Sequence, residues 1–233
     1  TLARLVLEIY SRTHNKEILD KGLQYASVRS SQYGLLITRL SKYSSLNKDI
    51  AQLTQLKLNI SNQSKLKSSL DARLKKLSQF ETHVNSAICS REIVLQAISL
   101  DVLMLENQRL YNDLLNIPAP KGLKINELQQ YKALLEQQAS PFKKKAGQIY
   151  EKLVVIWTNK SWVENIANNY VDARFEYKSA LKTDIQELMK HSPSGKKAQL
   201  QSALDEATKI PSERAVLQAQ DRIRKNPFET HPV

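Results

Sequence analysis

The sequence predicts an all-α fold, and three observations support that prediction. Five glycines and seven prolines in 233 residues are too few for the tight turns of β-sheets or for glycine-rich phosphate loops. Apolar residues recur at spacings of three and four along most of the chain, which is the period of an α-helix. Six prolines, at positions 118, 120, 141, 193, 211 and 227, lie where this period is interrupted. We expect a right-handed helical-repeat solenoid of about ten or eleven antiparallel helices with a long central helical hairpin.

The first 60 residues predict four shorter helices, over 2–12, 16–29, 33–43 and 48–60. Polar joints separate them, such as Thr13 to Asn15 and the pair Ser44-Ser45. These helix lengths are typical of repeat units.

The long hairpin follows. One apolar stripe runs from Leu66 to Ile88 and predicts a helix of about 25 residues after Ser64. Its other face is basic, with Lys65, Lys67, Arg73, Lys75 and Lys76. A second helix carries apolar residues between Ile93 and Leu114, with Glu92, Asp101 and Glu106 expected to point outward. Two long helices joined by a short connection pair antiparallel.

The strongest interruption of the chain is the stretch from Ile117 to Gly122, which contains Pro118 and Pro120. Each proline disfavours helix in the residue before it, and glycine tolerates turn conformations. We place a boundary here between residues 1–116, helical repeats that end in the long hairpin, and residues 117–233, a C-terminal helical array with a short extended tail.

The second half predicts a helix over 125–139 and a new helix through Ile156 that begins at Ser140-Pro141, an N-cap followed by proline. A long helix over 161–188 ends before the break at Ser192 to Gly195. Two short helices, over 196–209 and from Pro211 to Lys225, and an extended tail over 226–233 complete the prediction.

A set of positions between residues 118 and 162 carries a family resemblance: Pro118-x-Pro120-x-Gly122-Leu123, Tyr131, Leu134-Leu135, Gln138-Ala139-x-Pro141-Phe142, Lys145-Ala146 and Tyr150. This region resembles the C-terminal region of long tetratricopeptide-repeat proteins of gliding and predatory bacteria. It departs from the general repeat pattern at Thr158, where a small residue is expected if Ala146 is the small residue of the preceding helix. The resemblance implies a degenerate solenoid that binds proteins, a periplasmic location and no catalytic residues.

The residues show no catalytic or metal-binding pattern. The four histidines are far apart in sequence, and no two glycines lie within six residues of each other. A single cysteine, Cys89, excludes an internal disulfide and a cysteine-based zinc site. We therefore expect no enzyme and no cofactor, with a cryptic active site as the alternative. The longest apolar run, 93–105, is interrupted by polar residues and is shorter than a membrane span, so no transmembrane segment is expected.

The net charge of +12 is evenly divided. Residues 1–116 hold 16 Lys and Arg against 10 Asp and Glu, and residues 117–233 hold 19 against 13, which is +6 in each half. Nucleic-acid-binding proteins usually concentrate such charge on one face. A basic domain that binds a polyanion, such as nucleic acid, anionic lipid or a cell-wall polymer, is therefore the second hypothesis, with Lys143, Lys144 and Lys145 as one focus.

The aromatic residues instead favour binding to another protein, which is the first hypothesis. Phe142, Tyr150, Trp157 and Trp162 lie in a short segment that contains both tryptophans, and the two tryptophans flank a helix break. Amphipathic rings exposed on a helical groove often anchor a partner segment. We expect a non-enzymatic protein–protein interaction scaffold, the C-terminal helical-repeat segment of a larger bacterial envelope-associated protein, periplasmic or otherwise cytoplasmic. Its partner is expected to be a protein or peptide that contacts these four aromatics and the three lysines.

Overall fold

A computed structural model describes residues 1–89, 92–159 and 161–208, and these residues form helices and connecting loops without a β-strand. The helices are α1 (Leu2–Thr13), α2 (Lys16–Gly22), α3 (Ala26–Arg29), α4 (Gly34–Gln55), α5 (Gln63–Cys89), α6 (Ile93–Leu115), α7 (Ile125–Thr158), α8 (Ser161–Val171), α9 (Phe175–Lys190) and α10 (Ser194–Thr208). The all-α prediction is confirmed for this part of the chain. The predicted helix after Pro211 and the predicted tail lie outside the described residues.

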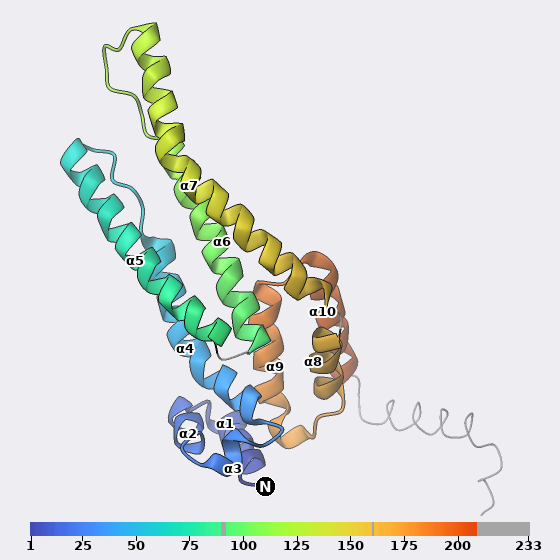
Figure 1. Ribbon diagram of the computed structural model, residues 1–233. Coiled ribbons are helices and arrows are strands. Elements are labelled where there is room, and N and C mark those ends of the chain that lie inside the picture. Colours follow the sequence, from blue (N-terminus) through green and yellow to red (C-terminus); the bar gives the residue numbers. More distant parts are fainter. Residues whose placement is uncertain (90–91, 160, 209–233) are drawn as a thin grey trace, which may run out of the picture.

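Helix α6 occupies the centre of the fold. Apolar residues are buried on several of its faces, including Val94, Leu95, Ile98 and Leu110, so it is covered from more than one side. Helix α7 packs along it more extensively than any other pair of the described helices, and α5 packs on another side. Figure 1 shows α5, α6 and α7 extending away from a base formed by α1 to α3 and from a cluster formed by α8, α9 and α10.

Two predicted helix breaks do not exist. Helix α4 continues through Ser44 and Ser45, which face solvent while Tyr43 and Leu46 are buried. These serines therefore belong to the polar face of one amphipathic helix. Helix α7 continues through Pro141.

The continuity of α7 at Pro141 has a local explanation. Proline has no backbone N–H, so the carbonyl of Gln137, four residues earlier, loses its usual donor. The hydroxyl of Ser140 donates to that carbonyl at 3.2 Å. Ser140 therefore compensates inside the helix for the bond that proline removes, whereas the sequence prediction used it as an N-cap.

Two predicted helices are each divided in the structure. Residues 16–29 form α2 and α3, and α2 ends at Gly22. Gly22 lies against Val6 of α1, where a Cβ atom would come within 2.9 Å of the valine side chain. The Arg29 guanidinium donates to the carbonyls of Leu23 and Gln24 and holds the chain reversal. Residues 161–188 form α8 and α9 with a break at 172–174, so that α8 packs on α10 while α9 packs on α1 and α4.

A buried ion-pair network joins three helices from distant parts of the chain. Arg39 on α4 donates from Nε and Nη2 to Asp184 on α9, at 2.9 Å and 2.6 Å, and from Nη1 to Glu92 at 2.9 Å. Glu92, predicted to point outward, is buried, and its other oxygen accepts the Leu95 N–H at the start of α6. The Tyr43 hydroxyl donates to Asp184.

Burial and charge oppose each other in this network. Burial disfavours the charged guanidinium, but the carboxylates of Asp184 and Glu92 outweigh burial and raise the pKa of Arg39. Burial raises the pKa of Glu92 in spite of Arg39. Burial together with the Asp184 charge raises the pKa of Tyr43. Arg39 therefore stays charged, and Tyr43 stays protonated as a hydrogen-bond donor to Asp184.

A second network corrects two more predictions. Arg73, predicted on the solvated basic face of α5, is buried and pairs with Asp113 and Glu106 of α6. Glu106, predicted to point outward, is buried as well. Arg109 pairs with Glu106 and donates to the carbonyls of residues 53, 54 and 56, which satisfies orphan carbonyls at the end of α4. These charges hold α4, α5 and α6 together.

We predict that Arg39→Met lowers the free energy of unfolding by about 3 to 5 kcal/mol, because it leaves the Asp184 and Glu92 carboxylates buried without their cation. Urea denaturation followed by circular dichroism measures the loss. Arg12→Met is the control, since Arg12 pairs with Glu8 on the surface and such pairs contribute at most about 1 kcal/mol. Equal small losses in both variants would contradict the role assigned to Arg39.

We also predict that Pro141→Ala raises the free energy of unfolding by about 2 kcal/mol, since the Gln137 carbonyl regains a backbone donor and the exposed proline ring contributes no core packing. Thermal and urea unfolding test it, with Gln138→Ala, an exposed neighbour, as the reference. A destabilised Pro141→Ala variant would show that proline contributes something other than a missing bond.

Candidate docking site

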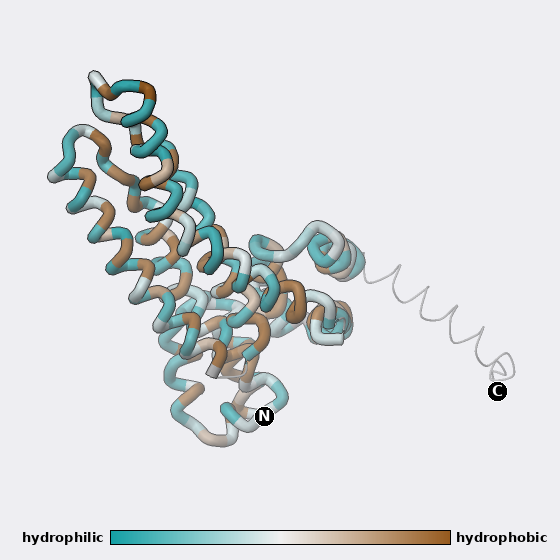
Figure 2. The backbone as a smooth tube through the Cα atoms, turned by 45° about the horizontal axis from the view of Figure 1, so that its top comes forward, coloured by the Kyte–Doolittle hydropathy of each residue, from teal (hydrophilic) through white to brown (hydrophobic). Residues whose placement is uncertain are grey.

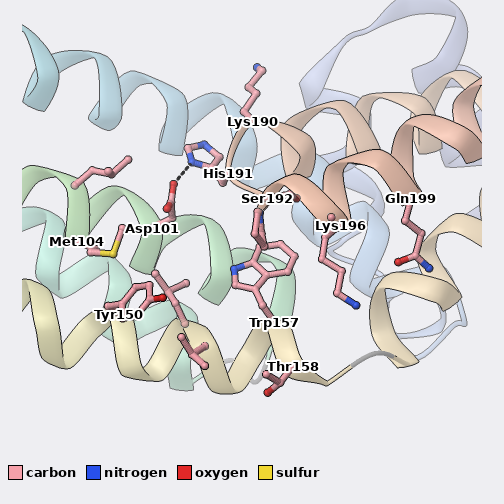
Figure 3. A pocket seen from close by; sticks show the side chains of 15 residues that line it. Asp101, Met104, Tyr150, Trp157, Thr158, Lys190, His191, Ser192, Lys196 and Gln199 are labelled. Atoms are coloured by element: carbon pink, nitrogen blue, oxygen red, sulfur yellow. Dashed lines mark hydrogen bonds and ion pairs between the residues drawn. The ribbon is translucent and has the colours of Figure 1, made fainter.

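A cavity of about 760 Å³ lies where α6, the C-terminal end of α7 and the α9–α10 connection meet. Figure 3 shows its lining side chains. Helix α6 contributes Asp101, Met104 and Leu105; α7 contributes Tyr150, Leu153, Val154, Trp157 and Thr158; and the end of α9 with the start of α10 contributes Lys190, His191, Ser192, Pro193, Gly195, Lys196 and Gln199. The cavity is of a size that accommodates a small ligand or a few side chains.

One wall of the cavity is apolar and partly exposed to solvent. Leu105, Tyr150 and Val154 are all exposed although they are large apolar or aromatic residues, and the Tyr150 side chain is 58% exposed. Tyr150, Val154 and Trp157 lie on one side of α7 because they follow the helical spacing of four and three. Leu105 of α6 lines the same cavity. This wall offers apolar area to a partner without any rearrangement of the fold.

Trp157 is held in place by the second tryptophan. The ring centroids of Trp157 and Trp162 lie 5.0 Å apart, with an angle of 39° between the planes. Trp162 is itself buried, and its Nε1–H donates to the carbonyl of Ile156 at 3.0 Å. The partly exposed Trp157 indole therefore presents a preorganised surface to the cavity.

The opposite wall is polar, and its groups are engaged in hydrogen bonds and ion pairs within the protein. Nδ1 of His191 lies 2.9 Å from Oδ2 of Asp101, as Figure 3 shows. The Ser192 hydroxyl donates to the backbone carbonyl of Leu188 at 2.7 Å, so it is not hydrogen-bonded to the imidazole as an activated nucleophile is. Lys190 pairs with Glu187 at 2.8 Å.

The seven residues predicted to contact a partner lie on α7 and at the start of α8, and they separate into two groups. Tyr150 and Trp157 line the cavity, and Trp162 supports Trp157 from behind. Phe142 packs against the core, the Lys143 ammonium lies 5.2 Å from the Tyr111 ring centroid, and Lys145 pairs with Glu81 of α5. Lys144 is exposed.

Phe142 and the three lysines thus lie outside the cavity. Two of the lysines already bond to α5 or α6, which reduces what they can offer a polyanion.

Sequence reasoning missed the polar wall. Asp101 and His191 are 90 residues apart and are joined only by the docking of α9 and α10 beside α6. No spacing rule connects such residues. The part of the chain that the structure describes holds no cluster of three or more His, Cys, Asp or Glu side chains placed to bind a metal ion.

Searches against protein-family models, curated proteins and solved structures find no match to this chain. In the described ranges, every helix is too short or too polar to cross a lipid bilayer.

We predict that Trp157→Ala lowers the free energy of unfolding by about 2 to 3 kcal/mol, because it removes the indole that packs against Trp162 and lines the cavity. Tyr150→Ala changes stability by less than about 0.5 kcal/mol, since the ring is mostly exposed. Chemical unfolding of both variants measures these differences. A large loss in Tyr150→Ala, or none in Trp157→Ala, would contradict the arrangement of the apolar wall.

Proposed function

We propose that this chain is a non-enzymatic protein-docking segment and that the cavity at the end of α7 receives an anchor side chain from a partner protein. The observation that supports this most directly is the apolar wall, where Leu105, Tyr150 and Val154 remain exposed beside the rigid Trp157. A contiguous exposed apolar surface next to a cavity is typical of interaction sites.

The rim specifies the chemistry of the partner. Lys196 lies at the cavity, while Lys190 is engaged by Glu187 and the carboxylate of Asp101 by His191. A partner segment with a large apolar or aromatic side chain next to an Asp or Glu complements both walls, since the ring fills the cavity and the carboxylate meets Lys196. The proposed partner is therefore an acidic amphipathic peptide segment.

The non-enzymatic part of the proposal is supported by the state of the polar groups. His191 and Asp101 bond to each other, and Ser192 bonds to a backbone carbonyl, so none of the three is positioned as a nucleophile with an adjacent base. These contacts fix the α9–α10 connection against α6. We assign them a structural role.

The wider setting of the proposal comes from the resemblance of residues 118–162. It supports a C-terminal helical-repeat segment of a larger bacterial envelope-associated protein in the periplasm. The successive packing of α5, α6 and α7 supports a degenerate tetratricopeptide-like repeat in this part of the fold. Helix α9 also contacts α1 and α4, which are distant in sequence. The fold therefore differs from a simple solenoid, in which each repeat contacts only its neighbours.

Site-specific photocrosslinking in the native cell tests the docking proposal. A photoreactive phenylalanine analogue at position 150 is expected to give one discrete cross-linked protein. The matched control is position 25, since Tyr25 is also 58% exposed but lies in the base of the fold. No product at position 150, or the same products at both positions, would reject docking at this cavity.

With the cross-linked partner purified, Tyr150→Ala is expected to weaken its binding about tenfold or more, and Tyr25→Ala to leave it unchanged. Lys196→Glu should weaken binding by repelling the acidic residue of the partner. An affinity that is insensitive to both substitutions at the cavity would show that the crosslink reports proximity only.

A further inference from the structure

Two loops extend from the end of the fold opposite to the base. We call residues 56–67, which join α4 to α5 and include the start of α5, the α4–α5 tip. Residues 117–134, which join α6 to α7 and include the start of α7, are the α6–α7 tip. Figure 1 shows both tips pointing away from α8, α9 and α10, with the α6–α7 tip reaching farther. The docking cavity lies at the other end of α7.

Both tips expose large apolar side chains that contribute nothing to the core. Ile125 is 77% exposed, more than any other large apolar side chain of the described residues, and Leu123 and Leu134 on the same tip are exposed too. Ile60 is exposed on the α4–α5 tip. In Figure 2 the projecting ends of the long helices are mostly hydrophilic, with short hydrophobic stretches among them.

Lysines surround the exposed apolar residues. The α6–α7 tip carries Lys121, Lys124 and Lys132 with one carboxylate, Glu127, for a charge of +2. The α4–α5 tip carries a charge of +3 from Lys57, Lys65 and Lys67. All six lysines are exposed, and none forms an ion pair with another described residue.

The tips are ordered by their own hydrogen bonds. In the α6–α7 tip, the Tyr131 hydroxyl donates to the Pro118 carbonyl at 3.2 Å, and Glu127 accepts the backbone N–H of Lys124 at 2.8 Å. Gly122 has φ of 89°, a conformation that favours glycine.

The α4–α5 tip is ordered in the same way. The Asn59 N–H donates to the Ser69 hydroxyl at 2.9 Å, and the Lys65 N–H donates to the Asn62 side chain at 2.8 Å. The exposed side chains of both tips are thus presented on fixed backbones, and binding a surface costs little ordering entropy.

We infer that the two tips dock this protein onto the surface of an anionic lipid bilayer. Ile125, Leu123 and Ile60 enter the boundary between headgroups and acyl chains, and the surrounding lysines contact the anionic headgroups. Isolated apolar side chains on projecting basic loops suit a soft and extended anionic surface. A folded protein partner instead provides a concave pocket for a continuous apolar face.

This inference does not depend on the docking proposal, because the tips and the cavity lie at opposite ends of α7. It places the cavity on the side that faces away from the membrane. A partner bound at the cavity and a bilayer bound at the tips do not compete for the same surface.

Co-sedimentation with vesicles tests the inference on the full chain. The protein is expected to pellet with phosphatidylcholine vesicles that contain about one third phosphatidylglycerol, to pellet far less with phosphatidylcholine alone, and to lose binding as salt increases. No binding to the anionic vesicles at low salt would overturn the inference.

Three variants separate the insertion of apolar side chains into the bilayer from the attraction of lysines to its anionic headgroups. Leu123→Ser with Ile125→Ser is expected to weaken partitioning about tenfold or more. Lys121→Gln with Lys124→Gln should weaken it by about fivefold per lysine. The control is Val155→Ser, since Val155 is 71% exposed at the far end of α7, and it is expected to bind as the parent does.

All substituted side chains are exposed, so thermal unfolding is expected to match the parent. An equal loss of vesicle binding in the Val155→Ser control and in the apolar variant would overturn the assignment to the tips. A loss in the lysine variant alone, with the apolar variant unaffected, would reject bilayer insertion in favour of a contact with any polyanion, including nucleic acid.

Discussion

The pairing of Arg39 with Asp184 and Glu92 is the constraint on which the rest of the structure depends. A guanidinium that is almost fully buried has to keep its carboxylates, because an unpaired ion in that position is strongly destabilising. The three residues come from α4, the start of α6 and α9. Their pairing therefore fixes how the N-terminal helices, the central helix and the C-terminal helices are placed relative to one another.

Both candidate binding surfaces follow from that placement. Because α9 is held against α4, the α9–α10 connection is placed beside α6, where His191 meets Asp101 and closes the polar wall of the cavity. Because α6 is held at its start, its other end projects with α7 and carries the α6–α7 tip away from the base. One long helix, α7, thus has an apolar docking surface at its C-terminal end and a basic, apolar tip at its N-terminal end.

The sequence predicted what depends on local patterns and missed what depends on distant contacts. The apolar stripe from Leu66 to Ile88 is uninterrupted, and α5 lies where it was expected. The break expected at Pro141 is absent because a neighbouring hydroxyl replaces the lost donor, a contact that a proline rule does not include. Arg73 and Glu92 looked like surface charges, since a charged residue reveals burial only through its partners. The aromatic cluster includes Tyr150 and Trp157, which line the cavity, but no sequence pattern connects them with His191 on the other wall.

A double-mutant cycle between Arg39 and Asp184 tests the central claim most directly. The free energy of unfolding is measured for the parent, Arg39→Met, Asp184→Leu and the double variant. If the buried pair organises the fold, the double variant loses at least about 2 kcal/mol less than the sum of the two single losses, because each single substitution leaves the other charge buried without its main partner. Losses that add within about 0.5 kcal/mol would show that the two residues act independently and would contradict this account.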